Sequence, residues 1–137
     1  MKKVFLLIGM LGLLASCSLD DEGQEFRYEI EPVTNVEFPD SLVLGQNYQI
    51  PVRYLRPSTC HSFFDFDYAR QDSTRIVTVI NQVFENDSCE DLTDTEVEQI
   101  LDFEVLYNYT YVFKFYQGQD TNDEPIYLTK NVPVKAN

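Results

Sequence analysis

The feature that most restricts the fold of this chain is a repeated alternation of apolar and polar residues with a period of two. It is strongest over residues 109–115, where Tyr109, Tyr111, Phe113 and Phe115 are separated by single residues. Successive side chains of a β-strand point to opposite faces of a sheet, so this period predicts strands that bury one face. We therefore expect sheets packed around an apolar core.

Seven segments carry this alternation or a β-branched apolar run, and turn residues separate them. The predicted strands cover residues 30–39, 48–54, 64–68, 75–84, 97–105, 109–115 and 126–134. The segment 75–84 is apolar on both faces, which predicts a central strand. Pro51 lacks an amide donor, which predicts an edge position or a bulge for the strand that contains it.

A short helix competes with the strand predicted at 97–105. Thr95 and Glu98 have the spacing of a capping box at a helix start. Val97, Ile100 and Leu101 would share one face of such a helix. The sequence leaves both interpretations of this segment open.

Short strands separated by turns favour an all-β fold, a single immunoglobulin-like β-sandwich of about seven antiparallel strands. The aromatic strand at 109–115, followed by a polar turn at 118–125, resembles the penultimate strand of small immunoglobulin-like β-sandwich domains. The resemblance identifies no specific family. An eight-stranded up-and-down β-barrel is the alternative, because the strands of a barrel alternate in the same way.

The first residues have the order of an export signal. Lys2 and Lys3 precede an apolar stretch over residues 4–14, which is short for a membrane-spanning helix. The following residues, Leu14-Ala15-Ser16-Cys17, resemble the lipobox of bacterial lipoproteins. The resemblance implies that the Cys17 sulfur receives a diacylglyceryl group and that the chain is cut before Cys17.

The domain organisation follows from this resemblance. It divides the chain into a signal peptide (1–16), a lipidated acidic tether (17–29) and a β-sandwich domain (30–137). Ser18 replaces the aspartate that usually retains lipoproteins in the inner membrane, which favours the outer membrane. The acidic run Asp20-Asp21-Glu22 is typical either of lipoproteins sent to the cell surface or of a solvated tether, so the membrane face stays open.

The charge of the exported part restricts its partners. Removal of residues 1–16 leaves 121 residues with eight basic and 23 acidic side chains, a formal charge of −15. Such a domain is repelled by nucleic acid and by anionic head groups, so neither is expected as a partner. The lipid on Cys17 is the expected contact with the membrane.

Cys60 and Cys89 are the cysteines that remain when Cys17 is lipidated. An even pair in an oxidising compartment predicts a disulfide bond. Closing a loop of roughly 30 residues stabilises a fold by about 3–4 kcal/mol on the chain-entropy model.

His61 is the single histidine of the chain. The parity of the strand predicted at 64–68 places Cys60 inward with Phe64 and sends His61 outward with Asp65. A paired Cys–His catalytic site is therefore not expected, and zinc lacks histidine and cysteine ligands. An exposed His61 predicts that its replacement changes the free energy of unfolding by no more than about 0.5 kcal/mol.

Two acidic segments are weak calcium candidates, because calcium prefers oxygen ligands on loops. One lies in the late turn and the other surrounds Cys89; their residues are Asp120, Asn122, Asp123 and Glu124, and Asp87, Glu90, Asp91 and Asp94. Neither has the spacing of an EF-hand, so solvated turns are favoured. Ser41 and Ser73 stand in Asp-Ser-Leu and Asp-Ser-Thr, which resemble an O-glycosylation acceptor of some bacteria.

These observations predict a lipid-anchored envelope protein without enzymatic activity or a cofactor. We expect it to act as a binding or accessory module for another protein or a glycan. Tyr116 and Tyr127, opposite the core parity, are candidate contacts. The alternative function is that of a lipocalin-like barrel that carries a small apolar ligand.

Overall fold

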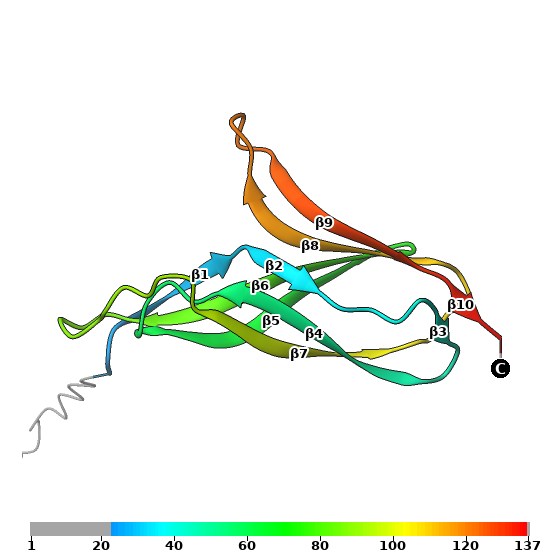
Figure 1. Cartoon of the computed structure of the whole chain (residues 1–137), viewed down its shortest axis with the longest axis horizontal. Helices are drawn as coiled ribbons and strands as arrows, with labels where there is room; N and C mark the ends of the chain where they lie inside the picture. The colour runs from blue at the N-terminus through cyan, green and yellow to red at the C-terminus, as the bar shows by residue number, and fades with distance from the viewer. Residues whose placement is uncertain (1–22, 137) are drawn as a thin grey trace, which may run out of the picture.

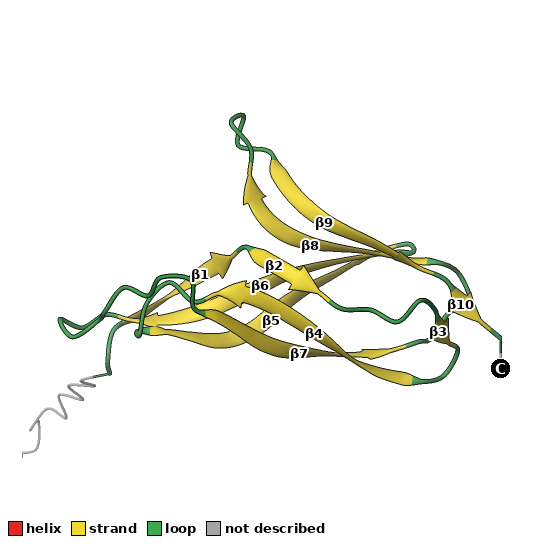
Figure 2. Ribbon diagram, in the orientation of Figure 1, coloured by secondary structure: helices red, strands yellow, loops and turns green. Residues whose placement is uncertain are grey.

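The computed structural model describes residues 23–136, and these residues form strands and loops without a helix (Figures 1 and 2). The predicted all-β fold is confirmed. The signal peptide, the lipobox, Cys17 and residues 17–22 of the predicted tether lie outside the described residues. No described segment forms a helix suited to crossing a membrane. The strands are β1 Phe26–Glu31, β2 Val33–Val36, β3 Leu42–Val43, β4 Asn47–Leu55, β5 His61–Gln71, β6 Thr74–Phe84, β7 Glu96–Glu104, β8 Tyr111–Gln119, β9 Pro125–Val132 and β10 Val134–Lys135.

The strands form a two-layer sandwich. One sheet contains β5, β6, β1, β8 and β9, the other has the order β2-β4-β7, and a short β3-β10 pair lies at the C-terminal end (Figure 1). The edge strands β5 and β9 do not pair with each other, nor do β2 and β7, so neither sheet closes within residues 23–136. The barrel alternative is therefore wrong for this part of the chain.

Strand β6 is the centre of the larger sheet, as predicted for the segment 75–84. Strand β5 pairs along one edge of β6. The other edge is shared, because β8 runs parallel to Thr74–Val77 and β1 runs antiparallel to Val79–Phe84. The β6-β8 and β3-β10 pairs are parallel, so the expectation of antiparallel strands fails at these two places.

The first strand begins earlier than the sequence analysis predicted. Strand β1 starts at Phe26, so residues 26–29 belong to the sandwich and not to the tether. Its register with β6 runs from Phe26 opposite Phe84 to Glu31 opposite Val79. Pro32 then separates β1 from β2, which pairs with β4 in the other sheet.

The core lies between the two sheets and consists of alternate residues of their strands. Ring centroids of Phe103 in β7 and Phe113 in β8 lie 4.9 Å apart, edge to face, which links the layers. Burial of each large apolar side chain stabilises the fold by about 1.5–3 kcal/mol. The largest fully buried apolar or aromatic side chains are Tyr54, Tyr111, Phe113, Phe115, Leu42, Ile50, Val33, Val52, Val77, Val79 and Val105.

Strand β4 contains Pro51 and yet is the central strand of the smaller sheet, so the predicted edge position is wrong. The Pro51 carbonyl accepts a hydrogen bond from the Glu37 amide on the side of β2. The amide and carbonyl of one strand residue point to the same side, so the missing donor also faces that side. Strand β2 has already ended at Val36, and the ladder between β4 and β7 stays complete.

Residues 96–104 form strand β7 and pair with β4 along its whole length. The helix alternative for this segment is wrong. Leu101 lies opposite Ile50 and Phe103 opposite Tyr48, so the alternation with a period of two buries Leu101 and Phe103 against the core. Packing of this face outweighs the local capping signal at Thr95 and Glu98.

Candidate functional site

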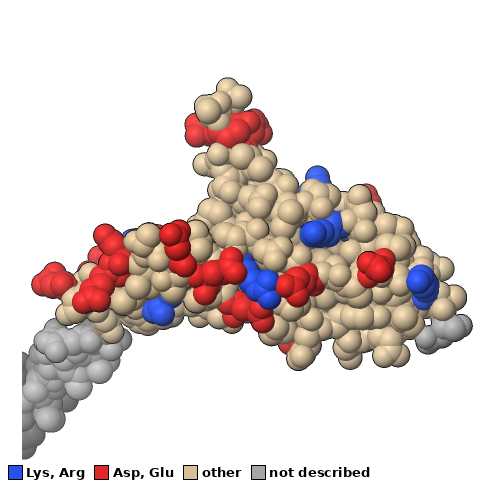
Figure 3. Space-filling view, in the orientation of Figure 1, with Lys and Arg blue, Asp and Glu red and all other residues tan. Residues whose placement is uncertain are grey.

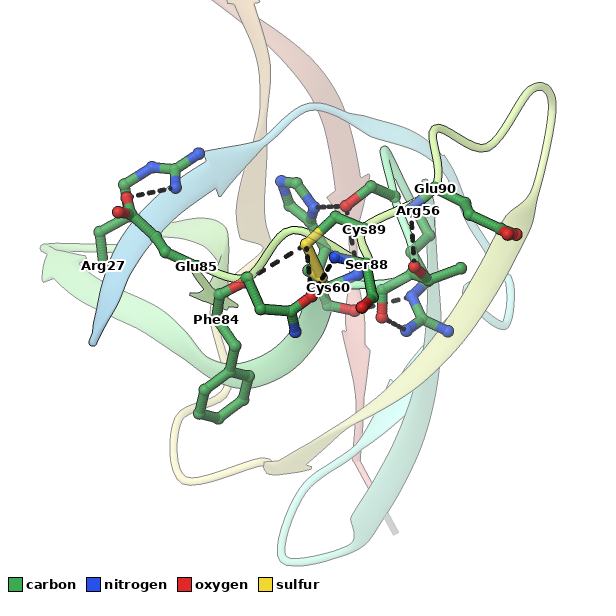
Figure 4. The surroundings of a disulfide bond; sticks show 12 residues. Arg27, Arg56, Cys60, Phe84, Glu85, Ser88, Cys89 and Glu90 are labelled. Carbon is green, nitrogen blue, oxygen red and sulfur yellow. Dashed lines mark hydrogen bonds and ion pairs between the residues drawn. A yellow bond between two sulfur atoms is a disulfide. The ribbon is translucent and has the colours of Figure 1, made fainter. Parts of the chain in front are cut away.

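The disulfide bond predicted between Cys60 and Cys89 is present, with the two Cα atoms 5.4 Å apart. It joins the turn before β5 to the loop after β6 (Figure 4). Backbone hydrogen bonds hold the same two segments together, from the Thr59 amide to the Glu90 carbonyl and from the Leu92 amide to the Pro57 carbonyl. This frame fixes the backbone on which His61 lies.

His61 points inward and is buried, which contradicts the predicted exposed position; 8 % of its side-chain surface is accessible. The cause is a β-bulge in β5 that leaves Phe64 without a partner. Asp65 lies opposite Ile80 and faces outward, as expected. Before the bulge the parity reverses, so that His61 lies opposite inward-facing Val83 and Phe64 is exposed.

Both ring nitrogens of His61 have polar partners. Nδ1 lies 2.7 Å from Ser58 Oγ, and Nε2 lies 2.8 Å from Glu29 Oε2 and 3.8 Å from Glu31 Oε1. Ser58 Oγ also accepts a hydrogen bond from the Cys60 amide, over 3.2 Å. These contacts fix the orientation of the imidazole ring.

The series Ser58–His61–Glu29 has the order of the residues in a serine-hydrolase triad, but its details differ. In such a triad the histidine meets the serine through Nε2, whereas here Ser58 meets Nδ1. Ser58 is buried and its oxygen is held by the backbone turn. We therefore assign Ser58 a role in orienting the ring of His61.

Strand β1 has an unusual orientation, because its charged residues lie on the same side of the sheet as the buried residues of β6, with Glu31 itself buried. Glu29 lies opposite Asn81, which is fully buried in β6. The Asn81 amide Nδ2 donates a hydrogen bond to Glu31 Oε1 over 3.1 Å, and Asn81 Oδ1 accepts one from the Tyr54 hydroxyl over 2.9 Å. A polar cluster thus links the two sheets; it consists of Glu29, Glu31, Tyr54, Ser58, His61 and Asn81.

The two glutamates of the polar cluster differ electrostatically. The hydrogen bond from His61, helped by Arg27, holds the pKa of Glu29 below its usual value. Burial raises the pKa of Glu31, and the hydrogen bond from Asn81 opposes this only in part. Arg27 pairs with Glu29 and Glu85 (Figure 4 shows Arg27 and Glu85), whereas within residues 23–136 the ion-pair partner of Glu31 is His61, with Nε2 3.8 Å from Oε1.

The opposite face of β1 is apolar and exposed. Phe26, Tyr28 and Ile30 have 48, 51 and 56 % of their surface accessible. Ring centroids of Tyr28 and Phe64 lie 4.6 Å apart, and those of Phe26 and Phe84 lie 6.3 Å apart. We call these five residues the aromatic face; it lies on the outside of the larger sheet.

The tyrosines expected to make contacts, Tyr116 and Tyr127, are half-buried and lie opposite each other on β8 and β9. Their ring centroids are 6.4 Å apart, and Lys114 Nζ lies 5.8 Å from the ring of Tyr127. The two rings therefore lie against each other, edge to face. Ser41 precedes β3 and Ser73 lies in the turn between β5 and β6; both are half-buried, and their modification stays a prediction.

The calcium candidates lie on exposed loops, and acidic side chains gather at the tip of the β8-β9 hairpin (Figure 3). There Asp120 Oδ1 accepts hydrogen bonds from the amides of Asn122 and Glu124, over 2.7 and 3.1 Å. Asp123 has a positive φ of 62°. The Asp120 carboxylate thus closes the turn itself. Asp87, Glu90, Asp91 and Asp94 are likewise exposed around Cys89.

The sequence analysis missed both faces of β1. The signal was present, because Phe-Arg-Tyr-Glu-Ile-Glu over residues 26–31 alternates strictly between apolar and charged residues. The predicted boundary cut this run in two, because residues 26–29 were assigned to the acidic tether and Ile30 and Glu31 to the first predicted strand. Even as a strand, it would have been oriented by the usual rule with its apolar face inward.

No protein-family model matches the chain, and searches of curated proteins and of solved structures found no significant match.

Proposed function

We propose that this chain is a lipid-anchored, non-enzymatic accessory module of the cell envelope that binds another protein through the aromatic face. The observation that carries the proposal is the outward orientation of Phe26, Tyr28 and Ile30 on a well-paired strand. A strand normally turns its apolar face to the core. Contiguous exposed aromatic residues are typical of protein interaction sites.

The surroundings of the aromatic face indicate the chemistry of the partner. Asp65 and Asp67 face outward on β5, and Glu25 and Glu85 are exposed beside the first and last residues of β1 and β6. An apolar centre with an acidic border fits a protein surface that has an apolar patch bordered by lysine or arginine. The border also disfavours an anionic lipid surface.

The position of the face supports an anchored module. Phe26 is nine residues after Cys17, and an extended segment of that length spans at most roughly 30 Å. If Cys17 carries the lipid, the aromatic face stays close to the membrane surface. The expected partner is then itself an envelope protein that exposes its binding patch near the membrane.

Site-specific crosslinking in cells tests the proposal. A photoreactive phenylalanine analogue at Tyr28 or Phe64 should give one discrete adduct with a second protein. The same analogue at Ile100, an exposed apolar residue on β7 of the other sheet, is the matched control. The double variant Tyr28→Ser/Phe64→Ser should remove capture at a third position, Phe26, and leave thermal unfolding nearly unchanged.

Several outcomes contradict the proposal. Equal adducts from Ile100 would mean that the aromatic face has no specific partner. Adducts made only with a second copy of the chain would identify self-association. Adducts that shift with glycan-degrading enzymes and contain no protein would identify a glycan ligand.

A further inference from the structure

We infer that Glu29, Glu31 and His61 form a binding site for one divalent first-row transition metal ion, with zinc as its best representative. Glu29 and Glu31 come from the inward face of β1, and His61 is the first residue of β5. One ligand atom of each lies within 4.8 Å of the others, and within residues 23–136 no other group of three His, Cys, Asp or Glu side chains converges so closely. The site is distinct from the aromatic face on the outside of the sheet.

The distances suit a small ion. His61 Nε2 lies 2.8 Å from Glu29 Oε2 and 3.8 Å from Glu31 Oε1. Ligand atoms around a tetrahedral zinc ion lie about 3.3 Å apart, since zinc–nitrogen and zinc–oxygen distances are about 2.0–2.1 Å. Small rotations of the two glutamate side chains would bring the three atoms to this separation. Three protein ligands leave a fourth position for water.

The negative charges of Glu29 and Glu31 also favour binding of a cation. Glu31 is 5 % exposed and receives one hydrogen bond from the neutral amide of Asn81. Arg27 forms an ion pair with Glu29, and within residues 23–136 no lysine or arginine forms an ion pair with Glu31. A buried carboxylate without a countercharge is costly. A divalent ion would neutralise both glutamates at once.

His61 can present a lone pair to this ion without losing its second partner. Metal binding at Nε2 requires the ring proton on Nδ1, and Ser58 Oγ, 2.7 Å away, can accept that proton in a hydrogen bond. Outer partners of this kind orient metal-bound histidines. Asn81 holds the Glu31 carboxylate in the same manner.

An ion can reach the site from the surface. The Glu29 side chain is 36 % accessible. An open pocket of about 470 Å³ beside the ring is lined by Arg27, Ser58 and His61 but by neither of the two glutamate ligands, so the accessible Glu29 side chain is the route to the site. The mixed nitrogen and oxygen ligands favour zinc and its neighbours, whereas calcium and magnesium prefer oxygen ligands alone.

Isothermal titration of the untagged full-length protein in detergent, stripped with chelator, tests the inference. Zinc should bind at one equivalent, and calcium at the same concentration should not compete. Glu29→Gln, Glu31→Gln and His61→Ala should each abolish binding of this equivalent. Ser58→Ala should weaken the affinity about 10- to 100-fold. The matched control is Asp120→Asn/Asp123→Asn in the β8-β9 turn, which should bind zinc like the wild type.

Circular dichroism of each variant separates lost binding from lost folding. Glu29→Gln is the decisive variant, because this partly exposed side chain can be changed with little effect on the core. Absence of zinc binding by the wild type would overturn the inference. So would full binding by Glu29→Gln and Glu31→Gln, or loss of binding in the Asp120→Asn/Asp123→Asn control. These outcomes do not depend on partner capture by the aromatic face.

Discussion

Asn81→Ala is expected to destabilise the protein strongly, because Asn81 is the side chain that joins the two sheets through the polar cluster. It is fully buried, its Oδ1 accepts a hydrogen bond from the Tyr54 hydroxyl over 2.9 Å, and its Nδ2 donates one to Glu31 over 3.1 Å. Its removal leaves a buried hydroxyl and a buried carboxyl group each without a partner. Each orphaned group costs about 1–3 kcal/mol, so the free energy of unfolding should fall by roughly 2–6 kcal/mol.

Tyr54→Phe isolates one of these two bonds. It removes the hydroxyl and leaves Asn81 Oδ1 unpaired, for a loss of about 1–3 kcal/mol. In the Asn81→Ala background the same change should cost much less, because the hydroxyl has already lost its acceptor. The double-mutant cycle should therefore give a coupling energy of roughly 0.5–3 kcal/mol.

Equilibrium unfolding in urea with chelator present measures these effects. The chain contains no tryptophan, so circular dichroism and tyrosine fluorescence serve as probes. The control is Asn131→Ala on the exposed surface of β9, which should change the free energy of unfolding by no more than about 0.5 kcal/mol. If Asn81→Ala behaves like this control, or if the cycle shows no coupling, the bond between the sheets does not stabilise the fold as argued.

Three further predictions concern the lipid anchor, the disulfide bond and the buried carboxyl group of Glu31. Cys17→Ser should abolish labelling by an alkyne fatty acid and release the chain from the membrane fraction; equal labelling of both forms would refute lipidation at Cys17. Without reductant, Cys60 and Cys89 should resist alkylation, and Cys60→Ser/Cys89→Ser should lower the free energy of unfolding by about 3–4 kcal/mol. In chelator, Glu31→Gln should be more stable than wild type at pH 8, because burial raises the folded-state pKa of Glu31 above its ordinary value of 4.5. A raised carboxyl pKa stabilises the fold below that ordinary value, and this stability is lost as pH rises through the folded-state pKa. The difference in the free energy of unfolding between Glu31→Gln and wild type, measured in urea, should therefore vanish below pH 4.5. A difference that stays constant with pH would contradict the prediction.

The sequence by itself determined the all-β class, most strands and the disulfide pair. Alternation with a period of two is local, since it depends only on which side chains share a face. It therefore located β4, β6, β7 and β8 within a few residues. The prediction of the cysteine pair needed only an even count and the oxidising compartment expected from the export signal.

Only the tertiary structure decided which face of a strand is buried at the polar end of the sandwich. The bulge at Phe64 shifts the parity by one residue and turns His61 inward; the adjacent Phe63 and Phe64 interrupt the local alternation but do not show which of the two faces the core. The orientation of β1 depends on its register with β6, which places Glu29 opposite buried Asn81 and near His61. The polar contacts of Glu29 outweigh the rule that apolar residues face inward. One of these contacts joins Glu29 to His61, which is distant from it in the chain. The candidate metal site and the aromatic face both arise from that long-range contact.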